Sequence, residues 1–95
     1  MRSLLKKRND NMKVKRKEEV LDGLFFDKEI SKLQNYKDII YFLKAKRFSE
    51  TYNGIKLEIN YSFITIPDKS YVIKNRDNSI LVCDREMFFN QFDIM

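Results

Sequence analysis

The sequence predicts an α+β domain in which one main helix and a short C-terminal helix pack on a small, mostly antiparallel sheet. Apolar residues recur at spacings of three and four over 33–43, a period that is typical of a helix lying on a core. They then alternate with polar residues over 55–63, as in a strand with one buried face. Two later apolar runs, 71–73 and 80–83, have the length of buried strands. The 95 residues leave room for a single domain.

The first predicted strand lies between Val20 and Phe26. This stretch is apolar except for Asp22 and Gly23, so it fits either a short strand pair or one strand with a bulge at the glycine. No repeat and no internal linker follows it, so the later elements are expected to belong to the same domain.

The main helix is predicted over about residues 36–46. Asn35 suits the N-cap position, and the carboxylate of Asp38, three residues later, stabilises the start of a helix. Lys44, Lys46 and Arg47 lie at the other end, where cations complement the free carbonyl groups. The helix is expected to present an apolar stripe to the core, formed by Leu33, Tyr36, Ile39, Ile40, Phe42 and Leu43.

A strand with one buried face is predicted after a turn at Asn53-Gly54. The buried face is expected to consist of alternate residues, namely Ile55, Leu57, Ile59, Tyr61 and Phe63. At Phe63-Ile64 the alternation slips by one position, which predicts a bulge or a crossing from one neighbouring strand to another. Pro67-Asp68 predicts the next turn.

The C-terminal part is predicted to form a hairpin followed by a helix. The apolar runs 71–73 and 80–83 flank a loop whose Asp and Asn residues suit positive φ, and their continuous hydrophobicity favours central strands. Asp84 is expected to cap a short helix that ends near Ile94, with three side chains turned inward, those of Met87, Phe88 and Phe92. Cys83 is expected to be a small core residue in a reducing compartment.

Positive charge is concentrated at the N-terminus. Residues 1–17 hold eight Lys/Arg against one acid, whereas residues 18–95 hold eleven against thirteen. This contrast predicts a basic N-terminal arm, residues 1–17, on a single compact domain, residues 18–95. The arm is expected either to contact phosphate or an acidic partner, or to be a solvated tail, and Met12 is an alternative start. The candidate contact residues are Arg2, Lys6, Lys7, Arg8, Lys13, Lys15, Arg16, Lys17, Lys44, Lys46 and Arg47.

The residue types present exclude most catalytic chemistry. The chain has no His and one Cys, so it lacks the usual general base and the usual transition-metal ligands. Its two glycines are too far apart to form a Gly-rich phosphate loop. Its clustered carboxylates show no spacing that supports acid-base catalysis, and solvated faces explain them. We therefore predict no enzyme, no catalytic or metal-binding residues and no cofactor.

The C-terminal residues resemble a group of small phage proteins. The run Ser70-Tyr71-Val72-Ile73-Lys74-Asn75, then Ile80–Asp84, then Phe88 and Phe92 is similar to a C-terminal pattern of small uncharacterised proteins of tailed phages and prophages. That pattern reads roughly Gly-Asp-Tyr-Ile-Ile-Lys-Gly, then a strand ending near Cys, then a Phe-containing helix. Here Lys69-Ser70 replaces Gly-Asp, and Asn75 replaces the last glycine. The resemblance covers about residues 12–95, implies a phage or prophage origin and transfers no site residue.

The expected location is the cytoplasm of a bacterial host cell. The abundance of Lys, Asn, Ile, Tyr and Phe is typical of AT-rich genomes. No apolar run approaches the roughly 20 residues that span a bilayer, so no membrane association is expected.

Three classes of function remain after these exclusions. The first is a small phage protein that inhibits a host defence or nucleic-acid-processing protein by occlusion, in the manner of an anti-CRISPR-like protein. The second is a direct nucleic-acid-binding protein that uses the basic arm. The third is a protein that sequesters an anionic nucleotide signal in a pocket with convergent cations. Aromatic exposure discriminates between them, because only exposed rings can stack on bases; the rings in question are Tyr41, Phe48, Tyr52 and Tyr61.

Overall fold

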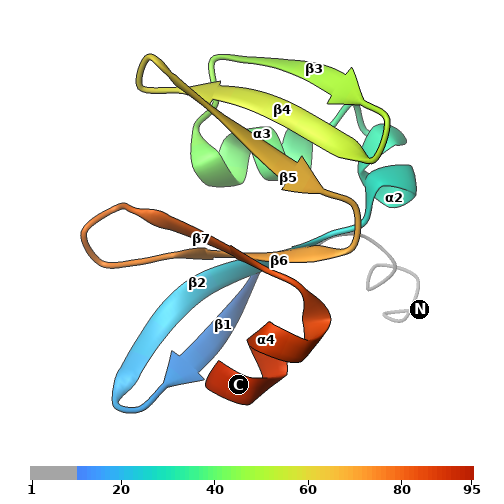
Figure 1. Ribbon diagram of the computed structural model, residues 1–95. Coiled ribbons are helices and arrows are strands. Elements are labelled where there is room, and N and C mark those ends of the chain that lie inside the picture. The colour runs from blue at the N-terminus through green and yellow to red at the C-terminus, as the bar shows by residue number, and fades with distance from the viewer. Residues whose placement is uncertain (1–10) are drawn as a thin grey trace.

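The computed structural model describes residues 11–95, and in this part of the chain two antiparallel sheets and three short helices form an α+β fold (Figure 1). The predicted class is confirmed, with two sheets in place of one. The five-stranded sheet has the order β7 (Ile80–Cys83), β6 (Ser70–Lys74), β2 (Glu19–Phe26), β1 (Asn11–Arg16) and β8 (Asp93–Ile94). The three-stranded sheet has the order β3 (Arg47–Thr51), β4 (Gly54–Ile59) and β5 (Ser62–Pro67). The helices are α2 (Lys28–Lys32), α3 (Lys37–Leu43) and α4 (Arg85–Gln91).

The central strands of the five-stranded sheet, β2 and β6, are buried on both faces. Along β2, Leu24 and Phe26 point to one face and Leu21 to the other, and along β6 Val72 and Ile73 divide in the same way. Helix α4 covers one face, where it encloses the α4 core: Val14, Leu21, Tyr71, Ile73, Cys83, Phe88 and Phe92. Helix α3 and the three-stranded sheet cover the other face (Figure 1) and enclose the α3 core: Leu24, Phe26, Tyr36, Ile39, Phe42, Leu43, Ile55, Leu57, Ile66 and Val72.

The two apolar runs near the C-terminus form the predicted hairpin of β6 and β7. Strand β6 is central, but β7 lies at the edge of the sheet, so its predicted central position is wrong. The run in β7 is continuous because Val82 packs against the α3 core while Cys83 is buried in the α4 core. Layers above and below the sheet therefore make an edge strand as apolar as a central one.

The predicted arm is corrected for its described part. Residues 11–16 are strand β1, which pairs with β2 on one side and with β8 on the other. Val14 is fully buried in the α4 core, whereas Lys13 and Lys15 point to the opposite, solvated face. The compact domain therefore begins no later than Asn11. Residues 1–10 of the predicted arm lie outside the described residues.

The main helix is shorter than predicted and begins differently. Asn35 is not its N-cap; Tyr36 occupies that position with a left-handed backbone (φ 60°), and helix α3 ends at Leu43. The preceding residues form α2, which the sequence pattern did not predict and which Asp27 caps through the backbone N–H groups of residues 29 and 30. Leu33 ends α2 rather than extending the stripe of α3, and it is exposed.

The predicted strand over 55–63 is a hairpin of two strands. Asn60 and Tyr61 have positive φ values of 50° and 66° and join Ile59 to its partner Ser62 in a two-residue turn. The turn shifts the alternation, so Ile64 and Ile66 face the α3 core and Phe63 faces outward. The predicted bulge or strand crossing, and the predicted burial of Tyr61 and Phe63, are therefore wrong.

The C-terminal helix forms as predicted in part, but it ends at Gln91 rather than near Ile94, because Asp93 and Ile94 pair with β1 as strand β8. Asp84 caps α4 by accepting a hydrogen bond from the backbone N–H of Met87. Phe88 and Phe92 are buried, but Met87 is 43% exposed, so only two of the three predicted core side chains lie inward. Cys83 is buried, as predicted. Within residues 11–95, no helix has the length and hydropathy needed to cross a membrane.

Candidate nucleic-acid interface

The outer face of the three-stranded sheet is the candidate interface. Residues that pair across neighbouring strands point to the same face of the sheet, so side chains of β3, β4 and β5 form two rows across the outer face. One row is Arg47, Glu58 and Phe63, and the other is Ser49, Lys56 and Thr65. Helix α3 lies on the opposite face, and no helix of the described chain covers this one (Figure 1).

Two exposed aromatic rings stand on the β4–β5 hairpin, each beside a lysine. The Nζ atom of Lys56 lies 4.8 Å from the ring centroid of Phe63, and that of Lys46 lies 5.2 Å from the ring centroid of Tyr61. The rings are 66% and 88% exposed. Cation–π contacts at such exposed sites are worth only about 0.5–1 kcal/mol, so a base can displace either ammonium group from its ring.

Local backbone geometry presents these rings. The positive φ of Tyr61 projects its ring beyond the end of the sheet, and the two-residue turn sets Phe63 on the outer face. At the other end of β4, Gly54 lies so close to β5 that a Cβ atom would collide with the carbonyl oxygen of Ile66. Only glycine allows this close pairing, which explains the Asn53-Gly54 signal as a contact requirement, since Gly54 does not have positive φ.

A hydrogen bond on the inner side of the three-stranded sheet links β3 to the start of helix α3. The hydroxyl of Tyr36 donates to Glu50 at 2.6 Å, joining the start of α3 to β3. This bond holds the pKa of Glu50 below its usual value, and Lys32 and Lys28 lower it further. Burial raises the pKa of Tyr36, and the Glu50 carboxylate raises it too. The ring of Tyr36 also packs against that of Phe48 at 5.3 Å between centroids.

The charge of this face is positive. Arg47 pairs with Glu58 at 3.3 Å between Nε and Oε1, and Glu58 is mostly buried beneath it. Lys46 and Lys56 form no ion pair within residues 11–95, so their charges are free to meet an anion. A hollow of about 230 Å³ lies beside Lys56, and its lining residues are Arg47, Phe48, Ser49, Lys56, Glu58 and Phe63.

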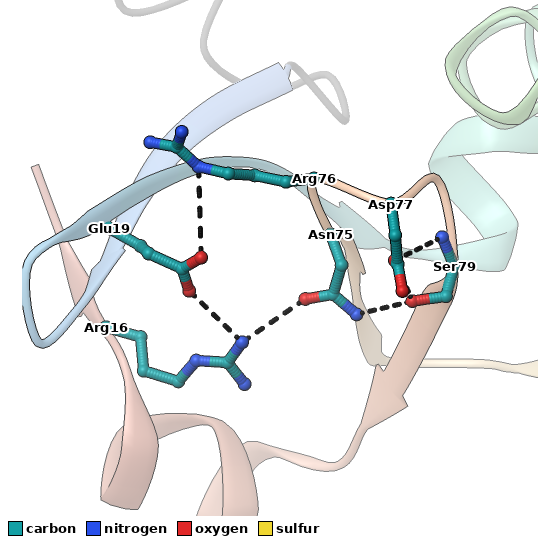
Figure 2. Close-up of polar contacts among 6 residues, drawn as sticks. All are labelled: Arg16, Glu19, Asn75, Arg76, Asp77 and Ser79. Carbon is teal, nitrogen blue, oxygen red and sulfur yellow. Dashed lines mark hydrogen bonds and ion pairs between the residues drawn. The ribbon is translucent and has the colours of Figure 1, made fainter.

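A second cluster of cations lies elsewhere, at the start of β2, and its charges are satisfied internally. Figure 2 shows the guanidinium of Arg16 between Glu19 and Asn75, with contacts of 3.4 Å and 3.3 Å. Arg76 reaches the other oxygen of Glu19 at 3.8 Å. The amide of Asn75 donates to the Ser79 hydroxyl, which bonds Asp77. We call this set the hairpin network, and its two Arg and two acids leave no net charge.

The predicted contact residues therefore fall into three groups. Lys44 and Lys46 lie between α3 and β3, and Arg47 begins β3; Arg47 is on the outer face, and Lys46 lies over the ring of Tyr61. Lys13, Lys15, Arg16 and Lys17 lie on β1 and its turn, where Lys13 pairs with Asp22 and Arg16 belongs to the hairpin network. The remaining four, Arg2, Lys6, Lys7 and Arg8, lie outside the described residues.

The four aromatic residues singled out as discriminators are all exposed. Tyr41, Phe48, Tyr52 and Tyr61 are 72%, 43%, 97% and 88% exposed. Sequence reasoning missed Phe63 and Lys56 as candidate contact residues. It placed Phe63 in the core, and it placed Lys56 on the solvated face of the strand without assigning it a role. A turn placed at Asn60-Tyr61 would have predicted the outward position of Phe63 beside Lys56, because it puts Ile64 and Ile66 inward and Phe63 outward.

The described residues offer little chemistry beyond binding. Among residues 11–95, no three Cys, Asp or Glu side chains are grouped to hold a metal ion. Burial raises the pKa of the Cys83 thiol, so it is a poor nucleophile at neutral pH. In comparisons with known proteins, the chain matches no family model, no curated protein and no solved structure.

Proposed function

We propose that the chain binds single-stranded nucleic acid on the outer face of the β3–β4–β5 sheet. The observation that carries this proposal is the pair of exposed rings, Phe63 and Tyr61, each next to a lysine without an ion pair in the described chain. Rings that stack on bases, flanked by cations that meet the backbone, are the two parts that single-strand binding requires. A duplex hides the faces of its bases, so the single strand is the favoured form.

Binding proceeds by exchange of partners at the two rings. A base takes the place of the ammonium group over Phe63, and the Lys56 side chain swings to the phosphate beside that base. Tyr61 and Lys46 repeat the arrangement at the end of the hairpin. Among residues 11–95, the two rows of the face contain no fully buried polar side chain that could read base edges, so the recognition tolerates many sequences.

The expected affinity is modest and depends on salt. Two or three phosphate contacts give a slope of log K against log salt of about −1.4 to −2.1, since each contributes about −0.7 with single strands. Each stacked base contributes about 1–3 kcal/mol. We therefore expect dissociation constants in the micromolar range near physiological ionic strength.

The test removes both rings while keeping the backbone. The variant Phe63→Thr/Tyr61→Asn preserves a strand residue and a residue that tolerates positive φ. Fluorescence anisotropy with labelled single-stranded RNA and DNA should show a loss of affinity of about 30-fold or more. The matched control, Tyr41→Ala, removes an equally exposed ring from α3 and should change affinity by less than about twofold.

Residues 1–10 carry cations of their own, so the measurement is repeated on a chain that begins at Asn11. If the double variant binds as tightly as the parent sequence, both at full length and in the chain that begins at Asn11, the outer face is not the binding site. Equal binding of duplex and single strand would reject the stacking mechanism.

Inhibition of a host protein by occlusion is the second candidate, and the hollow on the same face supports it. Arg47 and Phe63 lie on the outer face beside it, and Arg and aromatic residues dominate the energy of protein interfaces. A protein partner held mainly by such apolar anchors would be retained at high salt. Recovery of one stoichiometric host protein at high salt, lost in Phe63→Thr, would favour this function over nucleic-acid binding.

A further inference from the structure

A pocket of about 220 Å³ lies where three segments meet: the end of α3, the β4–β5 turn and the β6–β7 hairpin. The end of α3, the β4–β5 turn and the tip of the β6–β7 hairpin lie on the same side of the molecule (Figure 1). Its volume is below the roughly 300 Å³ at which pockets for drug-sized ligands begin, so a ligand as large as a nucleotide would lie partly outside it. It is separate from the hollow on the outer face, and the two share no lining residue.

The walls of the pocket combine an apolar floor with two cations. Phe42, Ile59 and Ile80 supply apolar surface, and the Nζ atom of Lys74 lies 4.8 Å from the ring centroid of Phe42. Lys44 is the second cation of the lining, which contains no acid. Neither lysine forms an ion pair within the described part of the chain. A ligand that fits must carry both a flat apolar part and a negative charge.

The rim of the pocket adds two amide side chains on unusual backbone. Asn60 and Asn78 line it, and both have positive φ, as does Lys44. The left-handed backbone of Lys44 belongs to the C-cap of α3, where its N–H donates to the carbonyl of Ile40, and that of Asn60 belongs to the β4–β5 turn. Asn amides present a donor and an acceptor side by side, the pattern that pairs with the N6 and N7 edge of adenine.

We propose that this pocket binds a nucleoside monophosphate group, with the base on the apolar floor and the phosphate between Lys44 and Lys74. The group comes either from a free nucleotide or from the phosphorylated end of a strand. The site does not depend on the outer face, although a strand bound there would bring its end toward Tyr61, the neighbour of Asn60.

The probe is adenosine monophosphate, followed through backbone amide chemical shifts of the full-length protein. We expect saturable shifts at Lys44, Asn60 and Asn78 at up to millimolar concentrations of this probe. Adenosine and ribose 5-phosphate, which each lack one half of the recognised group, should bind at least about tenfold more weakly. No saturable shift at these amides, or equal shifts with ribose 5-phosphate, would overturn the proposal.

The matched variant is Lys44→Asn/Lys74→Met. Asn tolerates the left-handed backbone at position 44, and Met keeps apolar contact over Phe42. Affinity for the probe should fall about tenfold or more, with the remaining amide spectrum unchanged. Phe63→Thr should leave it unchanged, so failure of this site and failure of the outer face are seen separately. Unchanged affinity in the double variant would reject the lysines as the phosphate contact.

Two oligonucleotides distinguish the sources of the nucleotide. A short strand with a 5′-phosphate and the same strand with a 5′-hydroxyl are tested as competitors of adenosine monophosphate in Phe63→Thr. Competition by the phosphorylated strand alone assigns the pocket to strand ends. Competition by neither strand, with the free nucleotide bound, assigns it to a free nucleotide.

Discussion

Two basic regions of this protein differ in what their cations contact. In the hairpin network, Arg16 lies against Glu19, Asn75 and the ring of Phe92, and its side chain is only 33% exposed. Around the β4–β5 hairpin, Lys56 on the outer face and Lys46 beside the turn lie over exposed rings and meet no acid in the described chain. The comparison shows that the number of positive charges in a region does not tell how many of them are unpaired. A cation is available to a partner when the fold leaves it without an acid.

The largest expected effect is loss of folding when strand β1, which carries Arg16 of the hairpin network, is removed. A chain that begins at Glu18 lacks the whole predicted arm, and with it Val14 and both strand pairings of β1. Because domains of this size are marginally stable, we expect no cooperative thermal unfolding. A chain that begins at Asn11 lowers the net charge by three but keeps β1, and should unfold cooperatively within a few degrees of the parent. Circular dichroism melts of both chains decide the point, and a folded chain from Glu18 would contradict the role of β1.

A smaller effect is expected at the support of the second region. Tyr36→Phe removes the hydrogen bond to Glu50 and should lower the melting temperature at pH 7 by a few degrees. Because the pKa of Glu50 is depressed in the fold, its contribution to stability is present above its unfolded value of 4.5 and is lost as pH falls below it. The difference between parent and variant should therefore shrink as pH is lowered from 7 to below 4. A difference that stays constant with pH would show that the bond does not couple to this carboxylate.

The smallest effects compare one cation from each region. Arg16→Ala should lower the free energy of unfolding by at most about 1 kcal/mol and leave the salt slope of strand binding unchanged. Lys56→Ala should lower the free energy of unfolding by at most about 1 kcal/mol, the value of its exposed cation–π contact, and should reduce the magnitude of that slope by about 0.7. Denaturant titrations and anisotropy at several salt concentrations measure both quantities. The contrast fails if Arg16→Ala changes the salt slope or Lys56→Ala leaves it unchanged.

The sequence pattern predicted the elements that have a strong period of their own. Strand β6, the hairpin to β7 and the Asp84 cap follow from local apolar runs and a capping residue. Strand β1 was hidden because its two inward residues, Met12 and Val14, alternate with cations that suggested an arm. Helix α2 has five residues, which is too short for a helical period to appear.

The candidate site was only partly predictable for a related reason. Lys46 and Arg47 were named from charge alone, and the structure places them at the border of the outer face. Phe63 was missed because the side a strand residue faces depends on where the chain turns. A two-residue turn at Asn60-Tyr61, without glycine, reverses that side for every residue of β5. The pocket was not predictable at all, because its walls come from three segments far apart in sequence.

The three-stranded sheet is one uninterrupted stretch of the chain, residues 47–67, placed between α3 and β6. Its inward side chains complete the α3 core, whereas the outward ones contribute nothing to either core. Substitution of exposed outward side chains such as Ser49, Lys56 and Thr65 should therefore leave both cores intact, whereas Gly54 on the same side cannot change because of its close contact with β5.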